Sequence, residues 1–261
     1  MFLIDIILLV GGKNSRLRSL KSKEPHKPKA LRKINNQYLI NLVLNNYISN
    51  DFKNFILPLG HYKKDFIDFF INKKKIGSKR CKIFLDCNKY KLASKISNNN
   101  INILLLDTGV NSNKASRVLK VIKKLNIKEF GVSYGDGVGD IDIKNHYKKH
   151  ISSKEIASAT AMNPYSQYGH FIFRGKKNKK IKDFIEKPKI NDWANIGYFF
   201  FKKESIKYFK IYFNKDLEMG IIKNLAKKNK LIMEKHYGFW KSVDTEKDAR
   251  ELSLILANDK K

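Results

Sequence analysis

Short runs of apolar residues alternate with helical patterns along the first half of the chain, and this alternation constrains the fold more than any other feature. Four runs are continuous and rich in Ile, Leu and Phe: Ile4–Val10, Phe55–Leu59, Ile103–Leu106 and Phe130–Tyr134. Apolar residues at helical spacing lie between them, at Leu39–Tyr47, Lys64–Ile71 and Ala115–Leu125. Continuous apolar runs of this kind are typical of parallel strands covered on both faces. Their order predicts an α/β layered fold with right-handed crossovers.

After Asp142 the pattern changes to extended stretches with fewer helices. They read EIASATAMN, HFIFRG, IKDFIEK and NIGYFFF, and we expect them to continue the sheet in a mixed, partly antiparallel way. The segments that follow are two helices, a strand and a closing helix, at Glu204–Phe209, Leu217–Lys227, Leu231–Lys235 and near Thr245–Leu256. No internal repeat and no linker rich in Pro, Gly or Ser interrupts the chain, so residues 1–261 are predicted to form one domain.

The strong positive charge does not by itself identify a partner. Lys and Arg number 54 against 24 Asp and Glu, and a formal charge of +30 is typical of proteins that bind nucleic acid or an anionic surface. Lys far outnumbers Arg, however, and the Lys clusters form no single stripe: Lys73–Lys75, Lys176–Lys180 and Lys227–Lys230. We interpret them as solvated faces, and nucleic acid is not the expected partner.

Cysteine content and apolar run length bear on the compartment. Cys81 and Cys87 have no neighbouring Cys or His pair that would complete a zinc site, so free thiols in a reducing cytoplasm are expected. No apolar run reaches the roughly 18 residues that span a membrane. The run Phe2–Val10 carries Asp5 and leads into Gly11, which indicates a strand rather than a signal peptide. We expect a cytoplasmic protein without membrane insertion.

The end of the first predicted strand has the composition of a phosphate-binding loop. In α/β sheets, ligands bind beyond the carboxyl ends of the strands. Here Gly11–Gly12 ends the strand, and Arg16, Lys27 and Lys29 follow. Glycine lets backbone N–H groups approach phosphate oxygens, and the cations offset their charge. The spacing matches neither a dinucleotide-binding fingerprint nor a Walker A loop, and a tight turn without a ligand also fits.

Two separated aspartates are candidates for a metal site. Asp136 follows the fourth predicted strand between Gly135 and Gly137, where a carboxylate can leave the sheet and small neighbours leave room for a phosphate-bearing ligand. Asp244 precedes the closing helix, where it or Thr245 can also be the N-cap. Mg²⁺ usually binds one or two carboxylates and completes its shell with phosphate and water, which suits this pair. A glycine-rich turn capped by Asp136 is the alternative.

Taken as a set, the motifs resemble one enzyme family. The segments LLVGGKNSRL, KPKALRKI, LDTG, YGDGVGDIDI, IEKP, NIGYFF and YGFWKSVDT occur in the order and at roughly the spacing seen in sugar-1-phosphate nucleotidyltransferases. Within this family the chain is most similar to the glucose-1-phosphate cytidylyltransferases, from Met1 to about Leu256. The resemblance implies a Rossmann-like nucleotide-diphospho-sugar transferase fold with a mixed, mostly parallel central sheet flanked by helices.

The resemblance also implies roles for individual residues. Arg16 and Lys29 would act at the reacting phosphates. Lys187 would bind the phosphate of the sugar, and Asn195 would bind one of its hydroxyls. The residues that would bind the nucleotide are Leu9, Val10, Gly11, Gly12, Lys13, Asn14, Ser15, Arg16, Thr108, Arg117 and Gly135.

The implied reaction joins CTP and α-D-glucose 1-phosphate, or a close sugar 1-phosphate, to give a CDP-sugar and pyrophosphate for surface polysaccharides such as lipopolysaccharide O-antigen. Mg²⁺ is the implied cofactor, because Asp136 and Asp244 match the family's two magnesium ligands. A phosphate monoester has a second pKa of about 6, so its oxygen can attack without a general base. Catalysis would rest on positioning and on charge neutralisation.

Two segments depart from the family pattern and leave other interpretations open. The loop GGKNSR has Asn14 and Ser15 where the family has G-G-x-G-T-R, and NKASR at Asn113–Arg117 has side chains where the family has glycines. A transferase that uses GTP, UTP or dTTP is therefore one alternative. A non-catalytic nucleotide- or RNA-binding protein on the same fold is another, although the retained metal aspartates favour an enzyme. A homo-oligomer is compatible with each, and the sequence carries no interface signature.

Overall fold

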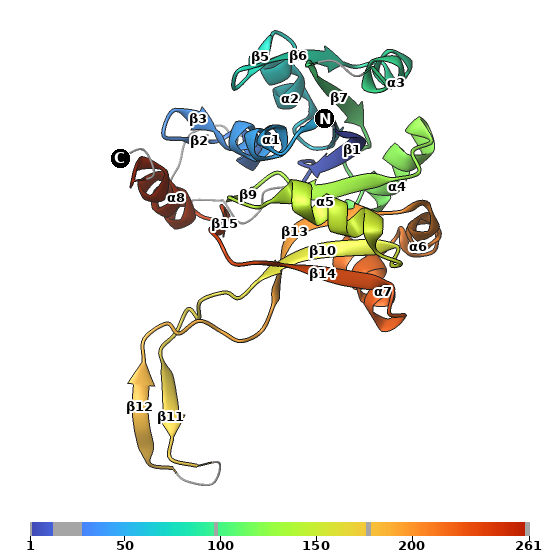
Figure 1. Ribbon diagram of the computed structural model, residues 1–261. Coiled ribbons are helices and arrows are strands. Elements are labelled where there is room, and N and C mark those ends of the chain that lie inside the picture. The colour runs from blue at the N-terminus through green and yellow to red at the C-terminus, as the bar shows by residue number, and fades with distance from the viewer. Residues whose placement is uncertain (1, 13–27, 97–98, 176–178, 259–261) are drawn as a thin grey trace.

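A mixed, mostly parallel sheet forms the centre of the protein. The computed structural model describes residues 2–12, 28–96, 99–175 and 179–258, and Figure 1 shows them as a layered α/β structure. The nine strands, in their order across the sheet, are β14 (Leu231–His236), β10 (Ala157–Met162), β13 (Ala194–Phe201), β8 (Phe130–Tyr134), β1 (Phe2–Leu9), β4 (Phe52–Leu59), β7 (Ile101–Asp107), β6 (Lys79–Phe84) and β5 (Lys75–Ile76). β8, β1, β4, β7 and β6 are parallel, whereas β13 runs antiparallel to β8 and β10, which confirms the predicted sheet.

Helices cover both faces of this sheet because its strands are apolar on both sides. On β1, Ile6 and Leu8 pack into one core and Ile7 into the other. The first core is covered by α1 (Leu39–Ser49), α2 (Lys63–Phe70), α5 (Ile143–Ser152) and α8 (Glu246–Asn258). The second is covered by α3 (Cys87–Ser94), α4 (Lys114–Leu125), α6 (Ile206–Tyr212), a π-helix (Leu217–Ile222) and α7 (Lys223–Lys227). No helix in the described part of the chain is long and apolar enough to cross a membrane.

The segment that contains β6 and α3 was not predicted from the sequence. β6 mixes charged and apolar residues instead of forming a continuous apolar run, because it lies near the edge of the sheet. The Asp86 carboxylate begins α3 by accepting hydrogen bonds from the N–H groups of Asn88 (2.7 Å) and Lys89 (2.9 Å). This N-cap was readable in the sequence, but the apolar pattern on either side of it was too weak to be assigned.

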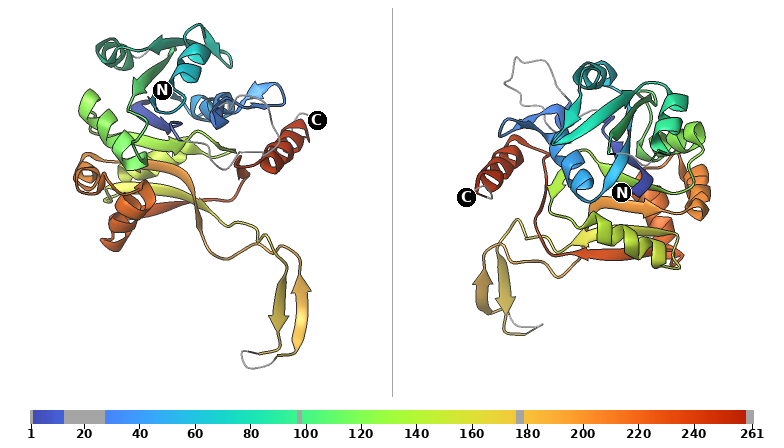
Figure 2. Two further views of the ribbon diagram at one scale, coloured as in Figure 1. Left: turned by 180° about the vertical axis from the view of Figure 1, so that it is seen from behind. Right: turned by 45° about the horizontal axis from the view of Figure 1, so that its top comes forward.

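The stretches HFIFRG and IKDFIEK do not continue the central sheet, so that prediction was wrong. They form β11 (His170–Phe173) and β12 (Ile181–Ile185), which pair antiparallel with each other. Figure 1 and Figure 2 show this pair as an arm that projects from the body. Every residue of both strands is exposed. The sequence pattern identifies an extended stretch but not its partner, and here each strand pairs with its neighbour in the chain.

Two further short strand pairs shape the surface near the centre of the sheet. They are β9 (Gly137–Gly139) with β15 (Trp240–Ser242), and β2 (Lys33–Ile34) with β3 (Gln37–Tyr38). After β15, α8 begins with Thr245 as its cap, one of the two expected residues. The Asp248 N–H donates to Thr245 Oγ1 (3.2 Å), and the Thr245 N–H donates to Asp248 Oδ2 (2.8 Å). This capping box means that the Asp244 side chain is not needed as the cap.

Candidate active site

The carboxyl ends of β1 and β8 lie side by side because the two strands pair in parallel, with Leu9 opposite Tyr134. The Gly135 N–H donates to the Leu9 carbonyl (3.3 Å), so the chain segments beyond the two strands stay adjacent. A Cβ at Gly135 would come within 2.5 Å of Val10 Cγ1, and glycine therefore permits this close approach. The two segments open on a cavity of about 570 Å³.

This cavity gathers residues from distant parts of the chain. The residues predicted from the sequence that line it are Leu9, Gly11, Gly12, Arg117, Asp136, Asn195 and Asp244. The lining residues that were not predicted as site residues are Ser112, Asn113, Lys114, Tyr134, Ile196, Asp216, Trp240 and Ser242. The cavity therefore lies at the edge of the sheet where ligands of α/β proteins bind.

The pairing of β9 with β15 brings Asp136 and Asp244 together. Ser242 lies opposite Gly137, and the Val243 N–H donates to the Asp136 carbonyl (3.0 Å). A Cβ at Gly137 would meet the indole of Trp240 at 2.9 Å, so the glycine makes room for that ring. Asp136 directly precedes β9 and Asp244 is the second residue after β15, which explains how two segments far apart in sequence place two carboxylates at one end of the cavity.

The Lys29 ammonium bridges these two carboxylates. Its Nζ lies 2.6 Å from Asp136 Oδ2 and 2.8 Å from Asp244 Oδ1. Lys29 begins the short 3₁₀ helix Lys29–Leu31 and its side chain is only 11% exposed, whereas those of Asp136 and Asp244 are 32% and 41% exposed. The carboxylates are thus arranged so that a single cation contacts both.

Two carboxylates that share a cation fit Mg²⁺. The described residues contain no group of three or more His, Cys, Asp and Glu side chains that could hold a metal. A metal enclosed by protein ligands alone is therefore not supported there, but Mg²⁺ usually takes one or two carboxylates and fills its other positions with water and substrate phosphate. The Ser242 hydroxyl donates to Asp244 Oδ2 (3.2 Å) and helps to orient that carboxylate. Asp136 and Asp244 are the residues that would hold the ion.

The buried guanidinium of Arg117 ties three strand ends together. Its Nη1 donates to the Leu59 carbonyl (2.8 Å) and to Thr108 Oγ1 (2.7 Å), and its Nη2 donates to the Gly11 carbonyl (2.9 Å). A Cβ at Gly11 would come within 2.7 Å of the guanidinium, and a Cβ at Gly60 within 2.4 Å. Arg117 lines the cavity, whereas Thr108 is buried behind it. Both residues position the turn that begins at Gly11.

The two residues predicted to bind the sugar phosphate lie in different places. Asn195 lines the cavity, and its Oδ1 accepts a hydrogen bond from the Gly197 N–H (2.9 Å). Lys187 follows β12 at the base of the arm, is 61% exposed and is not among the residues that line the cavity. The predicted loop residues that lie outside the described part of the chain are Lys13, Asn14, Ser15 and Arg16.

A second lysine cluster at the cavity wall was missed by the sequence analysis. Lys114 Nζ lies 2.6 Å from Glu218 Oε1 and 3.1 Å from Asp216 Oδ2. The Tyr134 hydroxyl also donates to Glu218, and the Lys114 ammonium is 5.2 Å from the centre of the Tyr134 ring. Burial opposes ionisation of Glu218, but the hydrogen bonds from Lys114 and Tyr134 outweigh it and lower its pKa. Only the lysine in NKASR was visible as a signal, because its partners lie far along the chain.

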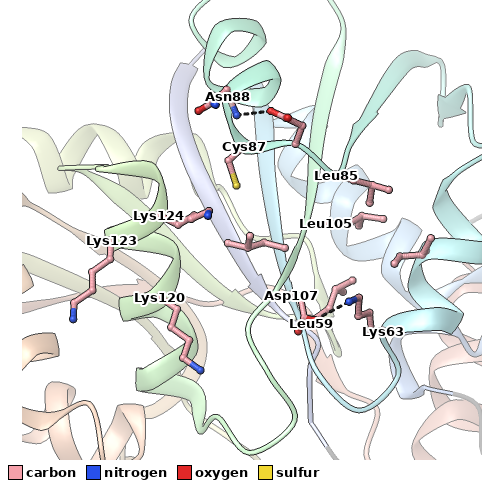
Figure 3. Close-up of a pocket in the computed structure, with 13 residues that line it drawn as sticks. Leu59, Lys63, Leu85, Cys87, Asn88, Leu105, Asp107, Lys120, Lys123 and Lys124 are labelled. Atoms are coloured by element: carbon pink, nitrogen blue, oxygen red, sulfur yellow. Dashed lines mark hydrogen bonds and ion pairs between the residues drawn. The ribbon is translucent and has the colours of Figure 1, made fainter.

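A larger groove of about 1030 Å³ lies beyond β4 and β7, between α2, α3 and α4 (Figure 3). Leucines form much of its floor, and Lys120, Lys123 and Lys124 project from α4 along one side. Its acidic groups are engaged locally: Asp107 pairs with Lys63 (2.7 Å), and Asp86 caps α3. None of the described residues that line this groove forms a cation bridge between two carboxylates. The smaller cavity is therefore the candidate active site.

Comparison with known proteins identifies the family and the fold of the chain. Residues 5–249 match the family described as "Nucleotidyl transferase". The glucose-1-phosphate cytidylyltransferases of Salmonella typhimurium and Salmonella typhi are similar to this chain, with 27% and 26% identity over 247 residues, 93% of this chain and 91% of each relative. Among solved structures, UDP-glucose pyrophosphorylase complexed with UDP-glucose has a TM-score of 0.66 at 15% identity, covering 99% of this chain and 100% of that one. The structural likeness shows the shared fold.

Proposed function

The chain belongs to the nucleotidyl transferase family, and we propose that it joins CTP and α-D-glucose 1-phosphate to give CDP-glucose and pyrophosphate. The observation that carries this proposal is the cation shared by Asp136 and Asp244 at one end of an open cavity. Transfer from a triphosphate requires positive charge where negative charge develops. The names of the two Salmonella relatives support CTP and glucose 1-phosphate as the substrates.

The proposed reaction needs no general base. A sugar 1-phosphate is largely a dianion at neutral pH, since its second pKa is about 6. One of its oxygens attacks the α-phosphorus of CTP, and the new P–O bond forms as the bond between the α-phosphorus and the bridging oxygen breaks. Pyrophosphate leaves with that electron pair, and no proton moves in the step. The protein has to hold the reactants in line and offset their charge.

The residues of the cavity suit these tasks. Gly12 leaves the backbone open to the triphosphate, while Gly11 makes room for Arg117, which holds the Gly11 carbonyl in place. Asn195, near the start of β13, would bind a sugar hydroxyl. Mg²⁺ held by the aspartate pair would withdraw electron density from the phosphates. Lys29, with Arg16 from outside the described residues, would add positive charge at the reacting centre.

Lys29 would have to leave the aspartates when a divalent ion binds, because both cations use the same oxygens. Its ammonium lies 2.6 Å and 2.8 Å from oxygens of Asp136 and Asp244. Once displaced, it becomes available to a substrate phosphate, which is the role implied by the resemblance. The lysine would thus neutralise the carboxylates before substrate binds and the phosphates afterwards.

A transferase that uses GTP, UTP or dTTP is the second candidate. Asn113 and Lys114 place side chains at the cavity wall, where the family pattern has glycines. Side chains at such positions change which hydrogen bonds a nucleotide pocket offers, and hence which nucleotide it accepts. The chemistry at Asp136 and Asp244 would stay the same with any of these nucleotides.

We also propose that the protein is a homo-oligomer. The arm exposes large apolar side chains, each between 37% and 57% accessible: Phe171, Ile172, Phe173, Ile181, Phe184 and Ile185. A two-stranded hairpin is marginally stable alone in water, and an apolar patch of this kind marks a protein contact. A second copy that covers the arm would bury these side chains. It would also give Lys187, which lies outside its own cavity, another cavity to face. A monomeric wild type in analytical ultracentrifugation would contradict this assembly.

Pyrophosphate release with Mg²⁺ and glucose 1-phosphate tests the function, with CTP, UTP, dTTP and GTP compared side by side. Release with CTP alone is the expected result. Release with another nucleotide instead would favour the second candidate. If none of the four nucleotides gives pyrophosphate release, with glucose 1-phosphate or with a panel of other sugar 1-phosphates, both candidates are contradicted. Because the substrates are metabolites of the cytoplasm, we place the reaction there, with the CDP-sugar destined for surface polysaccharides such as lipopolysaccharide O-antigen.

A further inference from the structure

The Lys114 cluster presents a hydrogen-bond donor and an acceptor side by side to the cavity. Lys114, Asp216 and Tyr134 line the cavity, and Glu218 supports them from behind. The Lys114 side chain is 35% exposed, and the side chain of Asp216, whose Oδ2 lies 3.1 Å from the Lys114 Nζ, is 49% exposed. Neither group has a part in the transfer chemistry proposed for Asp136 and Asp244. Both are nevertheless accessible to a ligand in the same cavity.

The contacts around the cluster hold it in one arrangement. The Tyr134 hydroxyl donates to Glu218 and so helps to fix that carboxylate. Gly197 has a φ of +85°, and a Cβ there would meet the Tyr134 ring at 2.4 Å, so the ring packs directly on the backbone of β13. Asp216 caps the π-helix by accepting from the Leu217 N–H (3.0 Å) with Oδ1, while its Oδ2 faces the lysine. The donor and the acceptor are therefore placed before any ligand arrives.

The cluster lies at the end of the cavity that is lined by the first residues of α4. Lys114 is the first residue of α4, one turn before Arg117, and residues three apart lie on the same side of a helix. Arg117 holds the carbonyl of Gly11, next to the proposed triphosphate site. A nucleoside that extends from this triphosphate along the start of α4 meets Lys114 and Asp216.

We propose that Lys114 and Asp216 bind the edge of the nucleobase and set which nucleotide is accepted, a role that rests on the proposed function. An ammonium can donate three hydrogen bonds, so one N–H remains for a ligand beside the two carboxylates. Cytosine presents a ring-nitrogen acceptor next to an amino donor, which complements this pair. Uracil and thymine carry an N–H donor at that ring nitrogen and a carbonyl acceptor in place of the amino group, so a base held in the same position has the two roles exchanged. A site built for one arrangement rejects the other strongly, because its own polar groups are left unpaired.

Nucleotide binding without turnover tests this role. Equilibrium dialysis gives the Kd of CTP, UTP, dTTP and GTP for the wild type, for Lys114→Ala and for Asp216→Asn, in which asparagine keeps the N-cap. For Lys114→Ala we expect the Kd of the preferred nucleotide to rise about tenfold or more, and its advantage over the next nucleotide to narrow by a similar factor. Asp216→Asn should also narrow the preference, since an amide can present either a donor or an acceptor. Lys123→Ala, an exposed lysine further along α4, is the matched control.

Two results would overturn the inference, and they differ in what they say of the proposed function. If the wild type prefers one nucleotide and both variants keep its Kd and its preference, Lys114 and Asp216 do not read the base, while the transferase function stands. If the wild type binds none of the four nucleotides, the proposed function fails and the inference with it. Circular dichroism establishes that each variant is folded. Lys114→Arg replaces the alanine variant if that one is not, because it keeps the charge but not the geometry of the ammonium.

Discussion

Lys114 in the cavity wall and Lys29 behind the cavity's two aspartates each lie between two carboxylates, yet the two clusters differ in how they are held. Lys29 is 11% exposed, and its partners are two aspartates that flank short strands. Lys114 is 35% exposed, and its partner Glu218 is also bound by the Tyr134 hydroxyl. The same ion-pair pattern therefore occurs once around a nearly buried lysine and once around a more exposed lysine whose partner Glu218 accepts a hydrogen bond from a tyrosine at the same oxygen.

This difference suggests what each end of the cavity does. At the Lys29 end, a cation with a stronger claim on both aspartates can replace the ammonium, as the proposed metal would. At the Lys114 end, replacement of the ammonium by another cation would leave the hydrogen bond between Tyr134 and Glu218 in place. The wall therefore keeps its shape and suits ligand recognition rather than neutralisation of charge during the reaction. We therefore expect changes at the first end to affect the chemical step and changes at the second to affect binding.

The largest effect is expected from Asp136→Asn at the exchangeable end. The substitution keeps the size of the side chain and the backbone hydrogen bond from Val243, but removes half of the charge that holds a divalent ion. We expect kcat to fall by about a hundredfold or more, because charge neutralisation at the transferring phosphate is lost. Pyrophosphate release at saturating substrate measures the change. Asp140→Asn is the matched control, since that carboxylate is 64% exposed and contacts His236. A near-normal rate for Asp136→Asn would remove the metal role from this end.

Lys29→Met tests whether the ammonium and a metal compete for the aspartates. Without the lysine, we expect the affinity of the nucleotide-free protein for Mn²⁺, used as a probe, to rise by about tenfold, because Asp136 and Asp244 then attract a cation without competition from the ammonium. The kcat should fall by about tenfold or more, since the phosphates lose a positive charge. Electron paramagnetic resonance of free Mn²⁺ measures the affinity. Lys114→Met should leave the Mn²⁺ affinity unchanged. An equal rise in Mn²⁺ affinity for the two variants would show that the two clusters do not differ in how they bind a cation.

The sequence predicted the Lys29 end of the cavity better than the Lys114 end. β1 and β8 are continuous apolar runs, so the placement of Gly11 and Asp136 at strand ends followed from their pattern. For Asp244 the sequence left two interpretations, a helix cap or a second metal ligand, and the family resemblance favoured the second, because β9 and β15 have three residues each and are too short to show a period. The structure pairs the two strands and brings Asp244 close to Asp136.

The Lys114 end depends on tertiary packing that no local pattern records. The sequence predicted a helix over Leu217–Lys227, but its first part is a π-helix, Leu217–Ile222, which Asp216 caps and in which Glu218 contacts Lys114 of α4. The arm shows the same limit, since the pattern identified β11 and β12 as extended without showing that they leave the sheet. In both cases the local sequence pattern indicates whether the segment is helical or extended. Which distant residues the segment contacts depends on tertiary packing, which the local pattern does not record.

Arg117 is a third cation at the cavity, and it differs from Lys29 and Lys114 because its hydrogen bonds go to carbonyl and hydroxyl oxygens. Gly60→Ala would place a Cβ 2.4 Å from its Nη2, and we expect the free energy of unfolding to fall by about 2 kcal/mol. Arg117→Lys should remove much of this clash, so the double variant should be more stable than the sum of the single changes predicts. Urea unfolding of the single and double variants measures this. Gly175→Ala is the control, since nothing lies within 4 Å of an added Cβ there. Strict additivity would show that Gly60 does not position the guanidinium.

The smallest effect is expected from Glu218→Gln at the fixed end. Glutamine still accepts the hydrogen bond from Tyr134 but no longer forms an ion pair with Lys114. Because both groups of that pair are about one-third exposed, we expect the free energy of unfolding at pH 7 to fall by only about 1 kcal/mol. Thermal melting followed by circular dichroism is sensitive enough for this difference. Glu234→Gln, which weakens an ion pair with Lys149 outside the cavity, is the matched control.

The pH dependence of that difference separates charge from packing. Burial tends to raise the pKa of Glu218, but the hydrogen bonds from Lys114 and Tyr134 outweigh burial, and the pKa in the folded protein lies below its usual 4.5. The stabilisation is therefore complete above pH 4.5 and is lost as the pH falls through the folded-state pKa. The gap in melting temperature between wild type and Glu218→Gln should shrink as the pH is lowered from 7 towards 3. A gap that stays constant would mean that Glu218 acts through shape alone, and the two lysine clusters would then differ in packing rather than in how their charges are held.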